Sequence, residues 1–118
     1  MTAFLLKLKM HKASWPFRMP VNPVSQAVPN YHEVVREPMD LKTIDNKIKG
    51  RLYKDLKEFD RDIRLIIANS YAFNSQDTVY YSLTKEFQGY YEQLWDECRR
   101  DPEGFTGIPA KREKRQHE

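Results

Sequence analysis

Cysteine and histidine are scarce in this chain of 118 residues. It has one cysteine, Cys98, and three histidines that lie far apart along the sequence, His11, His32 and His117. A single cysteine cannot form an internal disulfide, which fits a reducing compartment, and the histidine spacing does not match a zinc site. The sequence also lacks a Gly-rich phosphate loop and a nucleophile in a recognisable catalytic motif. We therefore expect no metal, no cofactor and no enzymatic activity.

Long apolar runs are missing as well. No stretch approaches the roughly 20 apolar residues that a helix needs to span a bilayer, and the N-terminus lacks the features of a secretory signal. At 118 residues the chain is long enough to bury a core as one domain without a metal or a disulfide. We expect a soluble, intracellular protein that does not bind membranes.

The body of the chain has no excess of positive charge, although the net charge is +3. Residues 1–13 carry three lysines and no acid, residues 106–118 carry a net charge of +2, and residues 14–105 hold 13 bases and 15 acids. Nucleic-acid-binding domains concentrate positive charge on the folded body, so we expect direct binding to nucleic acid to be at most secondary. The basic run KREKR at residues 111–115 is compatible with nuclear import, nucleic-acid binding or simple solvation.

Prolines gather in one stretch, since five of the seven lie between Ser14 and Met39. Each proline fixes φ and removes a backbone donor, so the sequence predicts that neither a helix nor a central strand runs through residues 14–39. This loop is too apolar for a solvated linker, because it holds Trp15, Phe17 and several valines that must pack on other parts of the protein. We infer that the loop is functional.

The remainder of the chain has the periodicity of amphipathic helices and no strand signal. The predicted helices span residues 2–13, 40–49, 55–74 and 79–100. Asp40 and Asp55 are the expected N-caps, Gly50 is the expected C-terminal glycine, and Asp101-Pro102 is the expected stop. The chain is thus predicted to be all-α, with four helices and a long loop between the first two.

The third predicted helix carries many charged residues between its apolar positions. They are Lys57, Asp60, Arg61, Asp62 and Arg64. A charged run on one side of an amphipathic helix is typical of a solvated face. We expect these side chains to point into solvent.

A pocket is expected at one end of the bundle. The apolar side chains of the long loop can pack only against the break between the last two helices, at residues 75–78. Asn74 lies beside that break and is either a helix C-cap with left-handed geometry or a recognition group whose amide points into the pocket. The tripeptide WPF at residues 15–17 is either a hydrophobic lid or a preformed apolar shelf for a ligand. Tyr80, in the first turn of the last helix, is expected to face the pocket.

Several short motifs agree in order and spacing with one known family. They are WPF at residues 15–17, PV at 20–21, Pro29, Tyr31, PMDL at 38–41 and YAFN at 71–74. Over about residues 2–100 the chain resembles a bromodomain. The resemblance implies a left-handed four-helix bundle whose first and last interhelical loops enclose a pocket for acetylated lysine. It also implies a non-catalytic nuclear protein that reads histone tails or other acetylated proteins in chromatin and transcription regulation.

The resemblance further implies roles for individual residues. Asn74 matches the residue that donates its side-chain amide to the acetyl carbonyl, and Tyr31 matches the residue that reaches the same carbonyl through a water. The apolar shelf, the wall and the gatekeeper region match Trp15, Pro16, Phe17, Val21, Val24, Val28, Phe73 and Tyr80. The expected rim consists of Gln26, His32 and Asp77. Gln26 stands where leucine is common in the family, and His32 stands where a second aromatic often follows Tyr31, so both bear on peptide preference.

The predicted domain boundary lies at residue 103, with a bromodomain over residues 1–103 and a flexible basic tail over residues 104–118. The isolated domain is expected to be a monomer whose partners are acetylated lysine peptides, histone tails first. The small footprint of one side chain predicts weak binding, with a Kd on the order of 10 to 1,000 μM. The alternative is a helical protein-interaction module whose pocket has lost acetyl-lysine binding.

Overall fold

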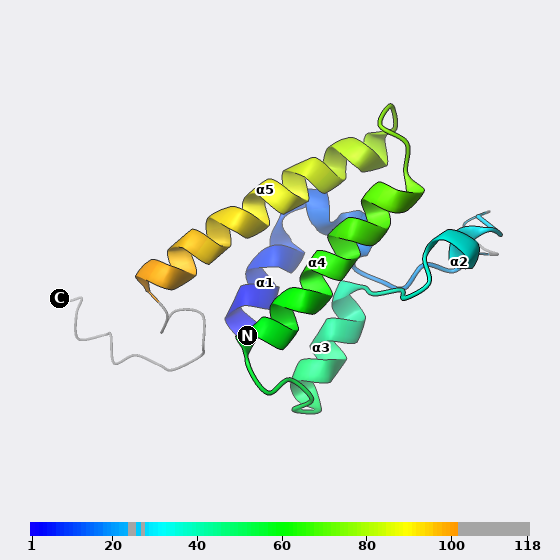
Figure 1. Ribbon diagram of the computed structural model, residues 1–118. Helices are drawn as coiled ribbons and strands as arrows, with labels where there is room; N and C mark the ends of the chain where they lie inside the picture. Colours follow the sequence, from blue (N-terminus) through cyan, green and yellow to red (C-terminus); the bar gives the residue numbers. More distant parts are fainter. Residues whose placement is uncertain (24–25, 27, 102–118) are drawn as a thin grey trace.

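Four helices form the body of the protein in a computed structural model that describes residues 1–23, 26 and 28–101. They are α1 (Thr2–Met10), α3 (Leu41–Lys49), α4 (Leu56–Phe73) and α5 (Val79–Arg100). Helices α4 and α5 lie side by side, and α1 packs against α3 and α5 (Figure 1). No strand occurs among the described residues. The prediction of an all-α bundle of four helices with a long first connection is confirmed.

An apolar core lies between these helices. At its centre the ring centroid of Phe4 on α1 lies 5.4 Å from that of Phe59 on α4 and 5.5 Å from that of Tyr91 on α5. Further buried side chains come from all four helices: Leu8, Leu41, Ile44, Ile63, Phe87 and Leu94. Because each buried Å² of apolar surface contributes roughly 25 cal/mol, this cluster is the main source of stability for the bundle.

The first helix is shorter than predicted, because it ends at Met10 rather than at residue 13. His11 has an extended backbone with ψ of 141°, and its Nδ1 accepts a hydrogen bond from the Ala13 N–H at 3.1 Å. The buried Ser14 hydroxyl donates to the His11 carbonyl at 2.8 Å. The His11 ring also stacks on Tyr90, with centroids 4.3 Å apart. These contacts stabilise a break in the helix at His11, and the apolar periodicity of the sequence does not predict that break.

The prediction that no helix enters residues 14–39 is wrong at both ends of the loop. A 3₁₀ helix, η1, spans Lys12–Phe17 and includes Pro16. Proline is tolerated there because its fixed φ suits 3₁₀ geometry and the short helix loses only one backbone donor. A single α-helical turn, α2, spans Tyr31–Val34, just after Pro29. The Tyr31 ring packs edge-on against Phe73 of α4, with centroids 4.9 Å apart, which anchors this end of the loop to the bundle.

The predicted N-caps are confirmed. Asp40 Oδ2 accepts from the Thr43 N–H at 2.9 Å, and Asp55 Oδ1 accepts from the Glu58 N–H at 3.1 Å. Helix α5 begins in the same way, since Thr78 Oγ1 accepts from the Tyr81 N–H at 3.2 Å. Each cap satisfies one backbone donor that a helix leaves free at its first turn, so these residues set the starting points of the three helices.

Gly50 is the C-cap of α3, as predicted, but it does not supply the left-handed residue. Its φ is −83°, whereas Arg51 has φ of 57°. The Arg51 N–H donates to the Ile48 carbonyl at 3.0 Å, and the Leu52 N–H donates to the Lys47 carbonyl at 2.9 Å. This is the Schellman arrangement of a helix end, in which the residue after the C-cap is left-handed.

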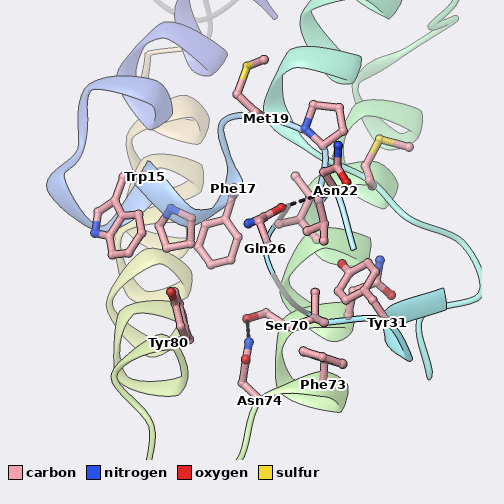
Figure 2. Close-up of a pocket in the computed structure, with 17 residues that line it drawn as sticks. Trp15, Phe17, Met19, Asn22, Gln26, Tyr31, Ser70, Phe73, Asn74 and Tyr80 are labelled. Carbon is pink, nitrogen blue, oxygen red and sulfur yellow. Dashed lines mark hydrogen bonds between the residues drawn. The ribbon is translucent and has the colours of Figure 1, made fainter. Parts of the chain in front are cut away.

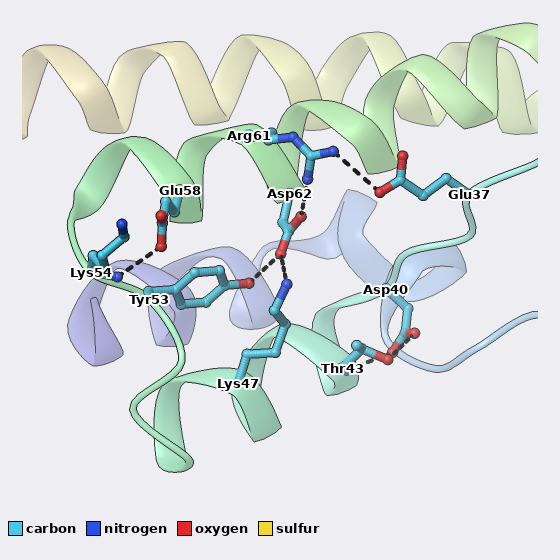
Figure 3. A network of polar contacts seen from close by, with 9 residues as sticks. All are labelled: Glu37, Asp40, Thr43, Lys47, Tyr53, Lys54, Glu58, Arg61 and Asp62. Atoms are coloured by element: carbon cyan, nitrogen blue, oxygen red, sulfur yellow. Dashed lines mark hydrogen bonds and ion pairs between the residues drawn. The ribbon is translucent and has the colours of Figure 1, made fainter.

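The charged residues of α4 are not all in solvent, contrary to the prediction. The Asp62 side chain is 1% exposed, and its Oδ2 accepts from Lys47 Nζ at 2.7 Å and from the Tyr53 hydroxyl at 2.6 Å (Figure 3). Asp60 Oδ1 accepts from the Tyr91 hydroxyl at 2.6 Å and from Trp95 Nε1 at 3.2 Å. Both carboxylates therefore join α4 to neighbouring elements, and the buried charge of Asp62 is tolerated because it has these partners.

Some predictions fall outside the described residues. These are the pocket position Val24, the helix stop at Pro102 and the basic tail over residues 104–118. Helix α5 ends at Arg100, with Asp101 as its C-cap. In the part of the chain that the structure describes, no helix is both long and apolar enough to cross a membrane. Within the same part, no three or more His, Cys, Asp or Glu side chains group as metal ligands.

Candidate functional site

A pocket of about 450 Å³ opens at one end of the bundle. Its wall is formed by η1 and the long loop on one side and by the C-terminal half of α4 and the first turn of α5 on the other. The pocket brings together most of the residues singled out in the sequence: Trp15, Pro16, Phe17, Val21, Gln26, Val28, Tyr31, Phe73, Asn74 and Tyr80. Figure 2 shows Trp15 and Tyr80 on one side, Tyr31 on the other and Asn74 between them.

Two expected rim residues do not line this pocket. His32 is exposed on α2, and its ring stands edge-on to Tyr31 with centroids 5.5 Å apart. Asp77 is exposed in the turn before α5. Gln26 does line the pocket, and its Oε1 accepts from the Asn22 N–H at 2.6 Å, which orients the Gln26 amide.

The aromatic residues of the pocket differ in their burial. Phe17 is 7% exposed and packs on Phe87 of the core with centroids 4.8 Å apart, so it belongs to the core and to the pocket wall. Trp15 is 50% exposed and Tyr80 is 43% exposed, and their ring centroids lie 5.8 Å apart. A lid that merely anchors a loop would bury its tryptophan. The half-exposed Trp15 therefore favours a shelf beside the pocket opening.

Asn74 is the C-cap of α4, but its backbone is extended, with φ of −98° and ψ of 135°. The position therefore does not require the left-handed geometry for which asparagine is often selected. Its side-chain Nδ2 donates to Ser70 Oγ at 3.0 Å. The second Nδ2 proton and Oδ1 form no hydrogen bond with the described residues, so the amide can both donate to and accept from a ligand.

Tyr31 adds a second polar group to the pocket. Its side chain is 9% exposed, and burial raises the pKa of its hydroxyl, with the Asp40 carboxylate adding to the effect. Both causes disfavour the phenolate. The Tyr31 hydroxyl is therefore neutral at pH 7 and retains its proton for donation.

Several lining residues were missed at the sequence level, among them Met19, Asn22, Met39, Ile66, Asn69 and Ser70. Ile66 and Ser70 precede Asn74 by eight and four residues, so helical spacing places them on the same face of α4, and this signal could have identified them. The loop residues carry no comparable signal, because their positions depend on how the loop folds back onto the helices.

The described lining contains no Asp, Glu, Lys, Arg or His. Without a carboxylate or imidazole, these residues offer no general base for a nucleophile. An apolar wall with a few amide and hydroxyl groups suits a neutral ligand that carries a polar amide. An ammonium group would lose its hydration there without gaining a counter-ion.

Comparison with known proteins identifies relatives. Residues 1–86 match the family model described as Bromodomain. The chain is 39% identical over 108 residues, 90% of its length, to a bromodomain-containing protein of Schizosaccharomyces pombe, and covers 15% of that protein. It is 42% identical over 77 residues to the histone acetyltransferase GCN5 of Yarrowia lipolytica, and the matched stretch covers 65% of this chain and 16% of that protein. It is 43% identical over 77 residues to the bromodomain-containing protein bet-1 of Caenorhabditis elegans, 65% of this chain and 9% of the relative. The chain thus spans about a sixth or less of these relatives.

Proposed function

The chain belongs to the bromodomain family, and we propose that its pocket binds the acetylated lysine side chain of histone tails or other acetylated nuclear proteins. The module acts as a reader in chromatin and transcription regulation and performs no catalysis itself. The observation that carries the proposal is the Asn74 amide, which keeps one N–H and its carbonyl oxygen available in a pocket whose described lining is uncharged.

Acetylation explains the selectivity that we propose. An unmodified lysine presents an ammonium ion, and burying it unpaired costs several kcal/mol even after relaxation. Acetylation removes that charge and leaves an aliphatic stem with an amide at its end. The stem suits the apolar wall that includes Phe17, Val21 and Val28, and the acetyl carbonyl accepts from Asn74. One modification thereby turns a rejected side chain into a ligand.

The remaining residues have secondary roles in this proposal. Tyr31 reaches the acetyl carbonyl through a water, and Trp15 with Pro16 forms a shelf for the lysine stem. Tyr80 and Phe73 narrow the pocket between α4 and α5. His32 and Asp77 are exposed and contact residues that flank the acetylated lysine, together with Gln26.

The context of the module is also part of the proposal. We place the folded domain at residues 1–103 and a basic tail at residues 104–118, in a nuclear protein, with the isolated domain a monomer. A single acetylated side chain gives a Kd on the order of 10 to 1,000 μM. Tight binding then requires paired acetyl marks or neighbouring modules, because linkage raises the effective concentration.

A calorimetric or NMR titration tests the proposal. Histone-tail peptides, acetylated and unmodified, are titrated into the wild type, into Asn74→Ala and into Asn46→Ala. Asn46 lies on the exposed side of α3 outside the pocket, so it controls for the loss of an amide in general. We expect binding of acetylated peptide only, unchanged in Asn46→Ala and lost in Asn74→Ala, because the buried acetyl carbonyl then lacks a donor at a cost of about 1 to 3 kcal/mol.

Other results identify the alternatives. No binding of any acetylated peptide at millimolar concentration would reject the proposal in favour of a helical interaction module with a non-binding pocket. Equal binding of both peptides, weakening steeply with salt, would indicate surface charge instead.

A further inference from the structure

A chain of three hydrogen bonds runs from the pocket into the interface between α4 and α5. Asn74 Nδ2 lies 3.0 Å from Ser70 Oγ, and Figure 2 shows the amide nitrogen directed at this hydroxyl. Ser70 Oγ lies 2.6 Å from Thr84 Oγ1 on α5. Thr84 Oγ1 in turn lies 2.7 Å from the backbone carbonyl oxygen of Tyr80. We call this chain the Ser70–Thr84 relay.

The direction of each bond in the relay is fixed by proton count. A carbonyl oxygen only accepts, so Thr84 must use its single hydroxyl proton to donate to Tyr80. Thr84 can therefore only accept from Ser70, and this bond takes up the single hydroxyl proton of Ser70. Ser70 in turn can only accept from Asn74, so the side of the Asn74 amide that faces Ser70 must be the nitrogen. The relay thus removes the ambiguity between the nitrogen and the oxygen of an asparagine side chain.

The relay is closed to solvent at its inner end. Thr84 is 0% exposed and Ser70 is 8% exposed. Water therefore cannot reach Thr84 to supply an alternative partner, and a buried hydroxyl without an acceptor is costly. Reversing the Asn74 amide would bring its oxygen against Ser70 Oγ, which has no proton left to offer. The nitrogen-inward orientation is accordingly the one that satisfies all three side chains.

We propose that Ser70 and Thr84 are positioning residues that hold the Asn74 amide in one orientation, so that the pocket presents an N–H donor at a fixed place and selects ligands with a carbonyl acceptor. This inference rests on the proposed function and names what determines its selectivity. An amide free to reverse would place its carbonyl oxygen, instead of an N–H, at this position for part of the time, and the carbonyl of an acetylated lysine would then meet no donor there. The relay therefore sharpens discrimination between acetylated and unmodified lysine.

The test begins with the protein without ligand. The side-chain NH₂ signals of Asn74 are identified in ¹H–¹⁵N spectra by their absence in Asn74→Ala. The variants are Thr84→Val, which keeps the shape and removes the hydroxyl, Ser70→Ala, and Thr84→Ser, which restores a hydroxyl. We expect the two Asn74 Nδ2 protons to be well separated in the wild type, to converge in Thr84→Val and Ser70→Ala, and to separate again in Thr84→Ser.

The second readout is the affinity for acetylated peptide. Thr84→Val and Ser70→Ala are expected to weaken binding about 3- to 10-fold, the equivalent of one ordinary hydrogen bond, and Thr84→Ser to restore it. Tyr71→Phe is the matched control, because the Tyr71 hydroxyl on α4 donates to Gln88 Oε1 on α5 at 2.7 Å. It removes a hydrogen bond between the same two helices without touching Asn74, and it should leave the NMR signals and the affinity unchanged.

The outcomes separate this inference from the proposed function. If wild type binds acetylated peptide and Asn74→Ala does not, but Thr84→Val and Ser70→Ala bind like wild type, the relay has no positioning role and the reader function stands. An equal loss in Tyr71→Phe would attribute the effect to general loosening of α4 against α5 and would also overturn the inference. If wild type binds no acetylated peptide, the proposed function fails. The positioning role of the relay is tested separately in the ligand-free protein, and Asn74 NH₂ signals that do not change in Thr84→Val would overturn it.

Discussion

Lys47 Nζ on α3 lies 2.7 Å from Oδ2 of Asp62 on α4, whose side chain is 1% exposed. The Tyr53 hydroxyl donates to the same oxygen at 2.6 Å, and Arg61 approaches Oδ1 at 3.4 Å. This group of contacts joins α3 and the connection that follows it to α4, the helix that ends beside Asn74 (Figure 3). Because none of these residues lines the pocket, substitutions here should change stability and leave ligand binding intact.

Lys47→Met is expected to lower the free energy of unfolding by about 2 to 4 kcal/mol, because it leaves a buried carboxylate short of its cation. Tyr53→Phe should cost less, about 1.5 kcal/mol, since it removes one hydrogen bond to the same oxygen. Lys49→Met is the control, because Lys49 is 73% exposed and pairs with Asp45 at the surface, where an ion pair contributes less than about 1 kcal/mol. Urea unfolding measures all three. Equal losses in Lys47→Met and Lys49→Met would contradict the prediction.

Arg51→Gly is expected to stabilise the protein by about 0.5 to 1 kcal/mol. Arg51 has φ of 57°, a left-handed conformation that costs a residue with a Cβ about 1 kcal/mol and costs glycine little. Gly50→Ala is the matched control at the neighbouring position, where φ is −83° and an added Cβ would meet the Asn46 oxygen at 3.4 Å. It should change stability by less than about 0.5 kcal/mol. The interpretation of the helix end is wrong if Gly50→Ala stabilises and Arg51→Gly does not.

Gly89→Ala should stabilise α5. Gly89 lies in the helix interior, and a Cβ added there would meet no atom within 4 Å. Alanine is favoured over glycine by about 1 kcal/mol in a helix, because glycine loses more backbone freedom on folding. A higher thermal midpoint with unchanged affinity for acetylated peptide is the expected result. Destabilisation would mean that Gly89 serves a contact outside the described residues.

The unfolding free energy should fall in alkaline solution because of Tyr91. Burial, followed by the hydrogen bond to Asp60, raises the pKa of Tyr91 well above its ordinary value. An unfolded tyrosine titrates near pH 10, so below that pH both states are protonated and the full stabilisation is present. Above about pH 10 the unfolded chain loses its proton first, and stability declines by about 1.4 kcal/mol per pH unit until the folded pKa is reached. Urea unfolding between pH 8 and 11 measures the slope, and Tyr91→Phe should make it shallower; an unchanged slope would contradict the assignment.

Tyr31→Phe should weaken the binding of acetylated peptide about 3- to 10-fold, the equivalent of one hydrogen bond. The ring contact with Phe73 is kept, so stability should change little. A titration compares this variant with Tyr71→Phe, whose hydroxyl lies outside the pocket and which should bind like wild type. Equal affinity of Tyr31→Phe and wild type would remove the hydroxyl from the proposed mechanism.

Helix positions were largely predictable because their determinants are local. Asp40 and Asp55 cap helices whose apolar residues recur at the helical period, and both caps are present in the structure. The end of α1 was not predictable, because His11 breaks the helix in favour of contacts with Ser14 and Tyr90, the latter far away in sequence. Local periodicity carries no information about such a competing partner.

The sequence by itself determined the helical bundle, the apolar nature of the long loop and the position of Asn74 beside a break, because these follow from periodicity, proline content and spacing. Only the tertiary structure decided which polar groups are buried and paired. From the sequence, Asp62 was predicted to be a solvated charge, and nothing indicated that Ser70 and Thr84, 14 residues apart, would meet. In the structure all three are buried and have partners on other elements. A polar side chain inside the protein is stable only when a partner meets it, and that partner comes from the packing of distant segments.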